Sequence, residues 1–127
     1  MAVELDHTIV PAHDPQASAQ FLAGILGLLV DPPVAQFTPV TLANGVSLDF
    51  LQREDVSLHH YAFQLSGEEF KAAFDRITDW GITYYADPGC RQPGQVYPAK
   101  DGRRGTYFRD PDGHLMEILT SVDGEMA

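Results

Sequence analysis

Apolar and polar residues alternate along several short segments of the chain, and a period of two is typical of β-strands. The alternation predicts strands over residues 3–10, 37–43, 46–52, 58–65, 82–85 and 115–120, with a further strand that ends at Phe108. Two segments between the strands repeat apolar residues every three to four positions, which predicts helices. The chain therefore runs twice through the order strand, helix and hairpin.

Both predicted helices carry start and stop signals. The first begins at Asp14-Pro15, an N-cap residue followed by a proline suited to the first turn, and it ends at Gly27. The second begins with the capping box Ser66-Gly67-Glu68-Glu69 and ends at Gly81. The apolar stripes predicted to face a core are Ala17, Phe21, Ile25 and Leu28 in the first helix, and Phe70, Ala73, Phe74 and Ile77 in the second.

The segment 105–120 is predicted to be a β-hairpin. Its turn is Asp110-Pro111-Asp112-Gly113, in which proline suits the first corner and glycine the left-handed position. A loop of this length places Tyr107 opposite Glu117. Glu117 is the only acid in an apolar strand, and a buried carboxylate is costly unless a cation, a hydrogen-bond network or a proton satisfies it.

The two halves of the chain form an internal repeat. A shift of 53 residues relates His7 to His60, and a shift of 68 relates Asp49 to Glu117. The second shift is larger because the long segment 86–102 adds residues to the second half. A histidine on the first strand and a carboxylate on the last strand therefore occur in both halves, and an approximate two-fold would bring all four towards one axis.

Imidazole and carboxylate groups are typical ligands of Zn, Mn, Fe or Ni ions in sites that keep open positions for a substrate. His7, His60 and Glu117 would provide two histidines and one carboxylate for such an ion. Asp49 could be a fourth ligand, although its side chain is shorter than that of Glu117. The alternative is a buried histidine–glutamate hydrogen-bond cluster without a metal.

The three other histidines are not predicted to belong to this site. His59 follows the opposite face of its strand, because successive side chains alternate. His13 precedes the first helix and His114 lies at the hairpin turn, and both are expected to be solvated.

Composition and charge limit the possible partners. The chain has 127 residues and a formal net charge of −10, which argues against a nucleic-acid partner. No apolar run is long enough to span a membrane. The single cysteine excludes an internal disulfide, and we expect a cytoplasmic protein. Five of the bases lie close together and form either a solvated loop or a patch for an anionic small molecule: Arg91, Lys100, Arg103, Arg104 and Arg109.

Three stretches resemble the vicinal oxygen chelate superfamily, also called the glyoxalase/bleomycin resistance protein/dioxygenase superfamily. They are Leu5-Asp6-His7-Thr8-Ile9, His60-Tyr61-Ala62-Phe63 and the segment 107–117. The resemblance implies an α+β fold in which two βαβββ modules form an open, cupped mixed sheet with the helices on the outside. It also implies a single domain over residues 1–127, with modules at about 3–55 and 56–121, and a homodimer in which modules can pair across chains.

The resemblance further implies a metal-dependent enzyme of lyase, transferase or dioxygenase type. Two adjacent oxygens of a small substrate would chelate a divalent Mn, Fe, Ni or Zn ion. Tyr107 would orient the substrate or donate a proton, and Asp49, where it is not a ligand, would act as a general base near the metal. The alternative is a small-molecule binding or sequestration protein of the same fold, such as a drug- or antibiotic-resistance protein, without catalysis.

Overall fold

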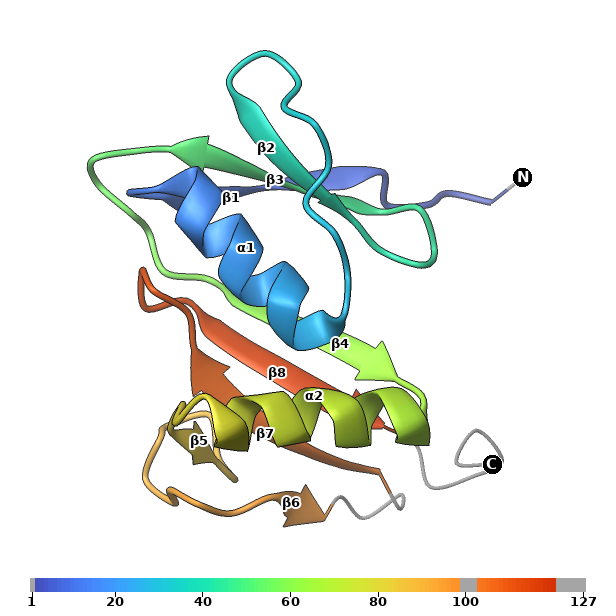
Figure 1. The fold of residues 1–127 in the computed structure, drawn as a ribbon, viewed down its shortest axis with the longest axis vertical. Coiled ribbons are helices and arrows are strands. Elements are labelled where there is room, and N and C mark those ends of the chain that lie inside the picture. Colours follow the sequence, from blue (N-terminus) through green and yellow to red (C-terminus); the bar gives the residue numbers. More distant parts are fainter. Residues whose placement is uncertain (1, 99–102, 121–127) are drawn as a thin grey trace. The chain divides into compact units, whose positions relative to one another are not determined.

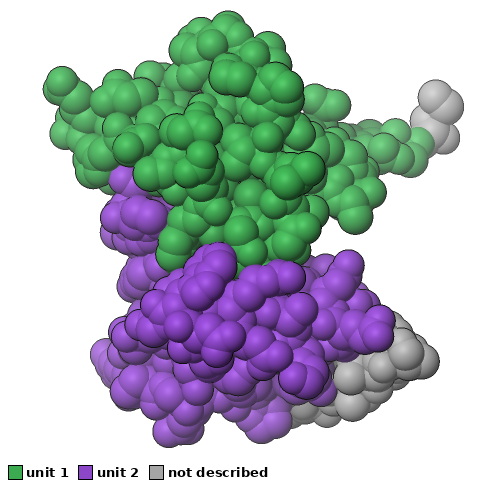
Figure 2. Space-filling model, viewed as in Figure 1, with its two compact units in different colours: residues 1–57 green, residues 58–127 purple. Residues whose placement is uncertain are grey.

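The computed structural model describes residues 2–98 and 103–120, so Lys100 of the basic segment lies outside the described residues. The chain divides into two compact units, residues 1–57 and residues 58–127, which Figure 2 shows in green and purple. Each unit contains one helix and its own mixed sheet (Figure 1). Neither helix of the described residues is long and apolar enough to cross a membrane.

The first unit is a three-stranded sheet with helix α1 packed against it (Figure 1). Its elements are β1 (His7–Ala12), α1 (Pro15–Leu26), β2 (Phe37–Thr41) and β3 (Ser47–Gln52). The strand order is β1-β3-β2, with β1 parallel and β2 antiparallel to the central strand β3. Because β3 is central, its side chains have neighbours from both other strands.

Helix α1 starts and stops where the sequence predicts, but its buried face agrees only in part with the predicted stripe. The Asp14 side chain accepts a hydrogen bond from the Ala17 amide, and Gly27 ends the helix in the left-handed conformation. The buried residues are Ser18, Ala19, Leu22, Ala23 and Ile25, whereas the predicted stripe residue Ala17 is exposed. Of the predicted stripe, Ile25 is buried as predicted, while Phe21 and Leu28 are partly exposed. The small residues of the buried face allow the helix to approach the sheet closely.

The second unit is a five-stranded sheet with helix α2 packed against β4 and β8. Its elements are β4 (His60–Leu65), α2 (Gly67–Asp79), β5 (Tyr84–Tyr85), β6 (Tyr97–Pro98), β7 (Arg104–Arg109) and β8 (Leu115–Thr120). The strand order is β4-β8-β7-β5, and the short β6 pairs with β7. The predicted hairpin is confirmed, because β7 and β8 are antiparallel and Tyr107 lies opposite Glu117.

The two units repeat the same strand register, which supports the internal repeat. In the first unit β1 and β3 are parallel, and His7 lies two residues before the partner of Asp49. In the second unit β4 and β8 are parallel, and His60 lies two residues before the partner of Glu117. Each unit therefore presents one histidine and one carboxylate on adjacent parallel strands in equivalent positions.

The first unit has one strand fewer than the βαβββ pattern. The segment 27–36 forms only an isolated bridge between Val34 and Phe37, together with a hydrogen bond from the Asp31 amide to the Pro39 carbonyl. Pro32 and Pro33 lie in this segment and have no amide hydrogen to donate to a strand ladder, which limits regular pairing. The corresponding place in the second unit is taken by β5.

The capping box of α2 gives a stability prediction. The Ser66 hydroxyl accepts from the Glu69 amide at 3.1 Å, and the Glu69 carboxylate accepts from the Ser66 amide at 2.9 Å. Replacing Ser66 by alanine should lower the free energy of unfolding by about 1 kcal/mol, because the amide loses its partner. Urea unfolding followed by circular dichroism measures the change. The control is Ser57→Ala, in the exposed connection before β4, and an equal loss in both variants would contradict the prediction.

Candidate functional site

The buried carboxylate of Glu117 is satisfied by a hydrogen-bond network in the second unit. Its side chain accepts from His60 Nε2 through Oε1 at 3.0 Å and from the Tyr97 hydroxyl through Oε2 at 2.6 Å. Glu117 is 8% exposed, so both contacts form in surroundings that exclude most water. The sequence predicts that a cation, a hydrogen-bond network or a proton satisfies this acid. The structure contains the hydrogen-bond network, and binding of a cation stays a prediction.

Three neighbouring strands position these groups. β8 lies between β4 and β7, so Glu117 has Ala62 on one side and Tyr107 on the other. His60 is two residues before Ala62 and therefore points to the same face of the sheet. The opposite face is covered by α2, which leaves the His60 side chain partly open at 46% exposure. The site is thus buried at its carboxylate and accessible at its imidazole.

Sequence reasoning missed Tyr97, which comes from the long segment before β7. β6 pairs with β7 so that Tyr97 lies directly opposite Gly105. A Cβ atom at Gly105 would lie only 2.5 Å from the Tyr97 hydroxyl, so the ring occupies the space that a side chain would need. An isolated glycine within a strand pattern indicates such a close approach. Gly105 was therefore the available signal, although it did not identify the approaching residue.

Tyr107 borders the same group of side chains. Its ring centroid is 5.8 Å from that of His60 and 5.7 Å from that of Tyr97. Desolvation raises the pKa of the Tyr107 hydroxyl, followed by the negative charge of Glu117, a hydrogen bond with Glu117 and the charge of Asp87. The pKa of the Tyr97 hydroxyl is also raised, first by burial and then by its hydrogen bond with Glu117. Both hydroxyls therefore keep their protons at neutral pH and can act as donors.

The His60–Glu117 pair fits a metal ion in its geometry. Two ligand atoms that are each about 2.1 Å from an ion are about 3.0 Å apart at the right angle of an octahedral site, and about 3.4 Å apart at the tetrahedral angle of a zinc site. The observed distance between His60 Nε2 and Glu117 Oε1 is 3.0 Å. An ion bound by both atoms would lie to one side of the line that joins them and would replace their hydrogen bond.

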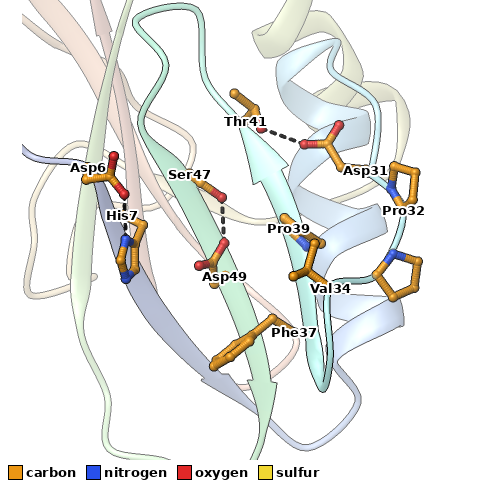
Figure 3. A pocket seen from close by; sticks show the side chains of 11 residues that line it. Asp6, His7, Asp31, Pro32, Val34, Phe37, Pro39, Thr41, Ser47 and Asp49 are labelled. Atoms are coloured by element: carbon orange, nitrogen blue, oxygen red, sulfur yellow. Dashed lines mark hydrogen bonds and ion pairs between the residues drawn. The ribbon is translucent and has the colours of Figure 1, made fainter.

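The first unit places its own histidine and carboxylate on adjacent strands, as Figure 3 shows. His7 Nδ1 lies 2.7 Å from Asp6 Oδ2, and the Ser47 hydroxyl donates to Asp49 Oδ1 at 2.5 Å. The hydrogen bond to Asp6 raises the pKa of His7 against the effect of desolvation, and the charges of Asp6 and Asp49 raise it further. A carboxylate on one ring nitrogen is the usual support for a histidine that binds metal through the other.

His7 and Asp49 line a pocket of about 530 Å³ within the first unit (Figure 3). One part of its wall is apolar and consists of Pro32, Pro33, Val34, Phe37 and Pro39. The polar part contains three carboxylates, those of Asp6, Asp31 and Asp49, and the described lining residues include neither lysine nor arginine. The Asp31 carboxylate is held by the Thr41 hydroxyl at 2.5 Å. The pocket therefore suits an uncharged or cationic molecule with a large apolar surface.

The predicted ligands thus form two pairs, one in each unit. No group of three or more His, Cys, Asp or Glu side chains comes close enough to hold an ion in the part of the chain that the structure describes. The set of His7, His60 and Glu117 takes one ligand from the first unit and two from the second. This three-ligand set, and the role of Asp49 beside it, stay predictions.

The solvated position predicted for His114 is wrong. Its side chain is fully buried, stacks on His59 at 5.7 Å, and meets the edge of Tyr61 at 5.8 Å. The His59 amide donates to His114 Nδ1 at 3.0 Å, and Asp110 Oδ1 accepts from the His114 amide at 2.8 Å. The turn brings His114 under the start of β4, a long-range contact that its position in the loop did not indicate. His13, in contrast, is exposed as predicted.

Two members of the predicted basic patch are held by contacts within the second unit. The Arg104 guanidinium lies 5.1 Å from the centre of the Phe70 ring, on the side of the sheet that α2 covers. Arg109 Nη1 donates to the Gly113 carbonyl at 2.8 Å. These two arginines therefore stabilise the helix–sheet contact and the hairpin turn rather than a shared anion site.

The internal repeat, the two mixed sheets and a direct comparison with known families identify the family of this chain. A family model described as the Glyoxalase/Bleomycin resistance protein/Dioxygenase superfamily matches residues 4–118. The chain therefore belongs to this superfamily, and the family and the α+β fold class predicted from the sequence are confirmed.

Known relatives include oxidases and thiol transferases. The solved structure of oxidase ChaP-H2 is 52% identical in sequence, with a TM-score of 0.92 and coverage of 100% of both chains. Metallothiol transferase FosB of Shouchella clausii (strain KSM-K16) is 30% identical over 69 residues, which are 54% of this chain but only 42% of that protein. FosB of Lysinibacillus sphaericus (strain C3-41) is 27% identical over 125 residues, covering 93% of this chain and 82% of that protein.

The burial of His114 gives a second stability prediction. His114→Ala should lower the free energy of unfolding by about 3 kcal/mol, because it leaves a cavity and removes the acceptor of the His59 amide. His13→Ala is the matched control, and its exposed side chain should contribute much less. Urea unfolding of both variants measures the difference. A similar small loss in both would mean that His114 is solvated after all.

Proposed function

We propose that the protein is a metal-dependent oxidase of the superfamily, in which His7, His60 and Glu117 hold a divalent ion. The observation that carries the proposal is the 52% identity to oxidase ChaP-H2 over the full length of both chains. The identity to the metallothiol transferases is about half as high over a comparable length, so a thiol transfer reaction has weaker support.

The ligand set agrees with oxidative chemistry. Two histidines and one carboxylate are typical of non-haem iron sites that keep positions open for substrate and dioxygen. When bound, such an ion supplies a Lewis acid for two substrate oxygens and, as Fe or Mn, a centre for electron transfer. The metal identity among Mn, Fe, Ni and Zn stays open, because this ligand set accepts several ions.

The side chains of the chain have separate roles in this proposal. Glu117 and His60 would bind the ion through Oε1 and Nε2, the two atoms that lie 3.0 Å apart in this structure. Tyr107 keeps its hydroxyl proton, which it would turn from Glu117 to a substrate oxygen when a substrate binds. Asp49 is not needed as a ligand and accepts a proton from the substrate, since it lines the pocket beside His7.

The pocket of the first unit suggests the class of substrate. Its three carboxylates would repel a negatively charged group, and its proline, valine and phenylalanine side chains favour apolar surface. We therefore expect an uncharged, largely apolar molecule with two neighbouring oxygens that can chelate the ion. We also expect a cytoplasmic protein, in which the lone Cys90 has no disulfide partner within the chain.

Metal content tests the proposal first. Protein purified without affinity nickel should contain close to one equivalent of Mn, Fe, Ni or Zn by elemental mass spectrometry, or take it up when the ion is added. Glu117→Gln should lose most of it, because an amide is a much weaker ligand than a carboxylate. Glu54→Gln, an exposed glutamate of the first unit, is the control and should retain the metal. Dioxygen consumption with catechol and 1,2-diketone probes should fall in parallel with the metal content.

The proposal fails if the wild-type protein neither contains nor takes up any of these ions. The competing function, a small-molecule binding protein without catalysis, would then be favoured. One observation supports that alternative, because both oxygens of Glu117 already have partners without an ion. Thermal-shift screening of apolar, uncharged compounds would then replace the search for a reaction.

We further propose a homodimer in which His7 of one chain completes the site of the other. Mixing His7→Ala with Glu117→Gln and refolding them together tests this arrangement. If the site is shared between subunits, the mixed dimer has one intact site, and metal binding recovers to about half of the wild-type level within the mixed dimers. If each chain completes its own site, no intact site forms and metal binding stays absent, which would contradict a shared site.

A further inference from the structure

The two oxygens of Glu117 have partners of different kinds. Oε1 faces His60, whose Nε2 is 3.0 Å away and whose side chain is partly exposed. Oε2 accepts a hydrogen bond from the Tyr97 hydroxyl at 2.6 Å, which is shorter than the contact with His60. The Tyr97 side chain is half-buried. Hydrogen bonds to a carboxylate are stronger than those between neutral groups, so the Tyr97 contact fixes the rotation of the carboxylate.

The sequence provides a space for this contact. Gly105 lies opposite Tyr97 in the paired strands β6 and β7. A Cβ atom at Gly105 would lie 2.5 Å from the Tyr97 hydroxyl and 2.6 Å from the Ile118 carbonyl oxygen, closer than real Cβ atoms come. A glycine is therefore required here if the Tyr97 ring is to lie across the sheet and reach Glu117.

The segment that carries Tyr97 is also anchored before it reaches the site. The Asp87 carboxylate accepts from the Arg91 amide at 2.9 Å and from the Gln92 amide at 2.8 Å. The Gly94 amide donates to the Tyr84 carbonyl at 2.8 Å. These contacts close the segment into a compact loop. The loop before Tyr97 is therefore already ordered by its own hydrogen bonds. Less conformational entropy is lost when the Tyr97 hydroxyl binds Glu117 than would be lost from a flexible loop.

We propose that Tyr97 is a positioning residue that limits Glu117 to one metal-binding oxygen. Tyr97 holds Oε2, and Tyr107 is a further hydrogen-bond partner of the carboxylate. Oε1 is therefore the oxygen presented beside His60 to the ion of the proposed function, on which this inference rests. A carboxylate that binds through both oxygens fills two positions around an ion, whereas one that binds through a single oxygen fills one. Tyr97 therefore keeps an additional position open for a substrate oxygen, and Gly105 makes this arrangement possible.

Metal titration of Tyr97→Phe tests the inference without an assay of activity. The variant keeps the ring and removes only the hydroxyl. Its dissociation constant for Mn(II), followed by electron paramagnetic resonance, should rise by about 10- to 100-fold, as is usual when the hydrogen-bond partner of a ligand is removed. The visible absorption of the Co(II)-loaded protein should also change, because the coordination of the ion changes with that of the carboxylate.

Two further variants distinguish a positioning role of Tyr97 from a general loss of structure. Tyr84→Phe is the control, since Tyr84 lies in the same unit but packs against Phe74 at 4.9 Å, and it should bind Mn(II) like the wild type. Gly105→Ala should weaken Mn(II) binding in the same direction as Tyr97→Phe, because the added Cβ displaces the ring. Circular dichroism and the thermal midpoint of Tyr97→Phe should remain close to those of the wild type.

The outcomes distinguish this inference from the proposed function. If the wild type binds Mn(II) and Co(II) while Tyr97→Phe has the same affinity and the same Co(II) spectrum, Tyr97 has no positioning role and only the inference is overturned. Tighter binding in Tyr97→Phe would overturn it as well. If the wild type binds neither ion, the proposed function and the inference fail together.

Discussion

The burial of one carboxylate in an inner strand of the second unit is the constraint on which the site depends. Glu117 lies on β8 between two other strands, and its desolvation would be costly without partners. His60 supplies one partner from β4, and Tyr97 supplies the other from the long loop. Gly105 is needed because Tyr97 can reach the carboxylate only across a strand position without a side chain.

The internal repeat gives both units the same framework but different surroundings for the acid. His7 and Asp49 have the same register as their counterparts in the second unit. Asp49, however, is bound by Ser47 on its own strand and faces an open pocket. The long loop that carries Tyr97 has no counterpart in the first half. The second unit therefore holds Glu117 in place through two other side chains, while the first unit leaves Asp49 facing a pocket that a small molecule could enter.

The pocket of the first unit and the arginines of the second unit differ in the contacts that their charges make. The first unit presents the carboxylates of Asp6, Asp31 and Asp49 beside an apolar wall. In the second unit, Arg104 and Arg109 are engaged by a ring and a backbone carbonyl. The acidic residues and the apolar wall of the pocket therefore disfavour a negatively charged ligand.

The sequence by itself determined the repeat, the helix caps and the hairpin register that sets Glu117 against Tyr107. These features depend on residues close in sequence, whose turn geometry and periodicity act locally. The tertiary structure decided the buried face of α1, the burial of His114 and the contact of Tyr97 with Glu117. Each of these depends on strands paired far along the chain, because local patterns state which residues prefer burial but not which neighbours will cover them.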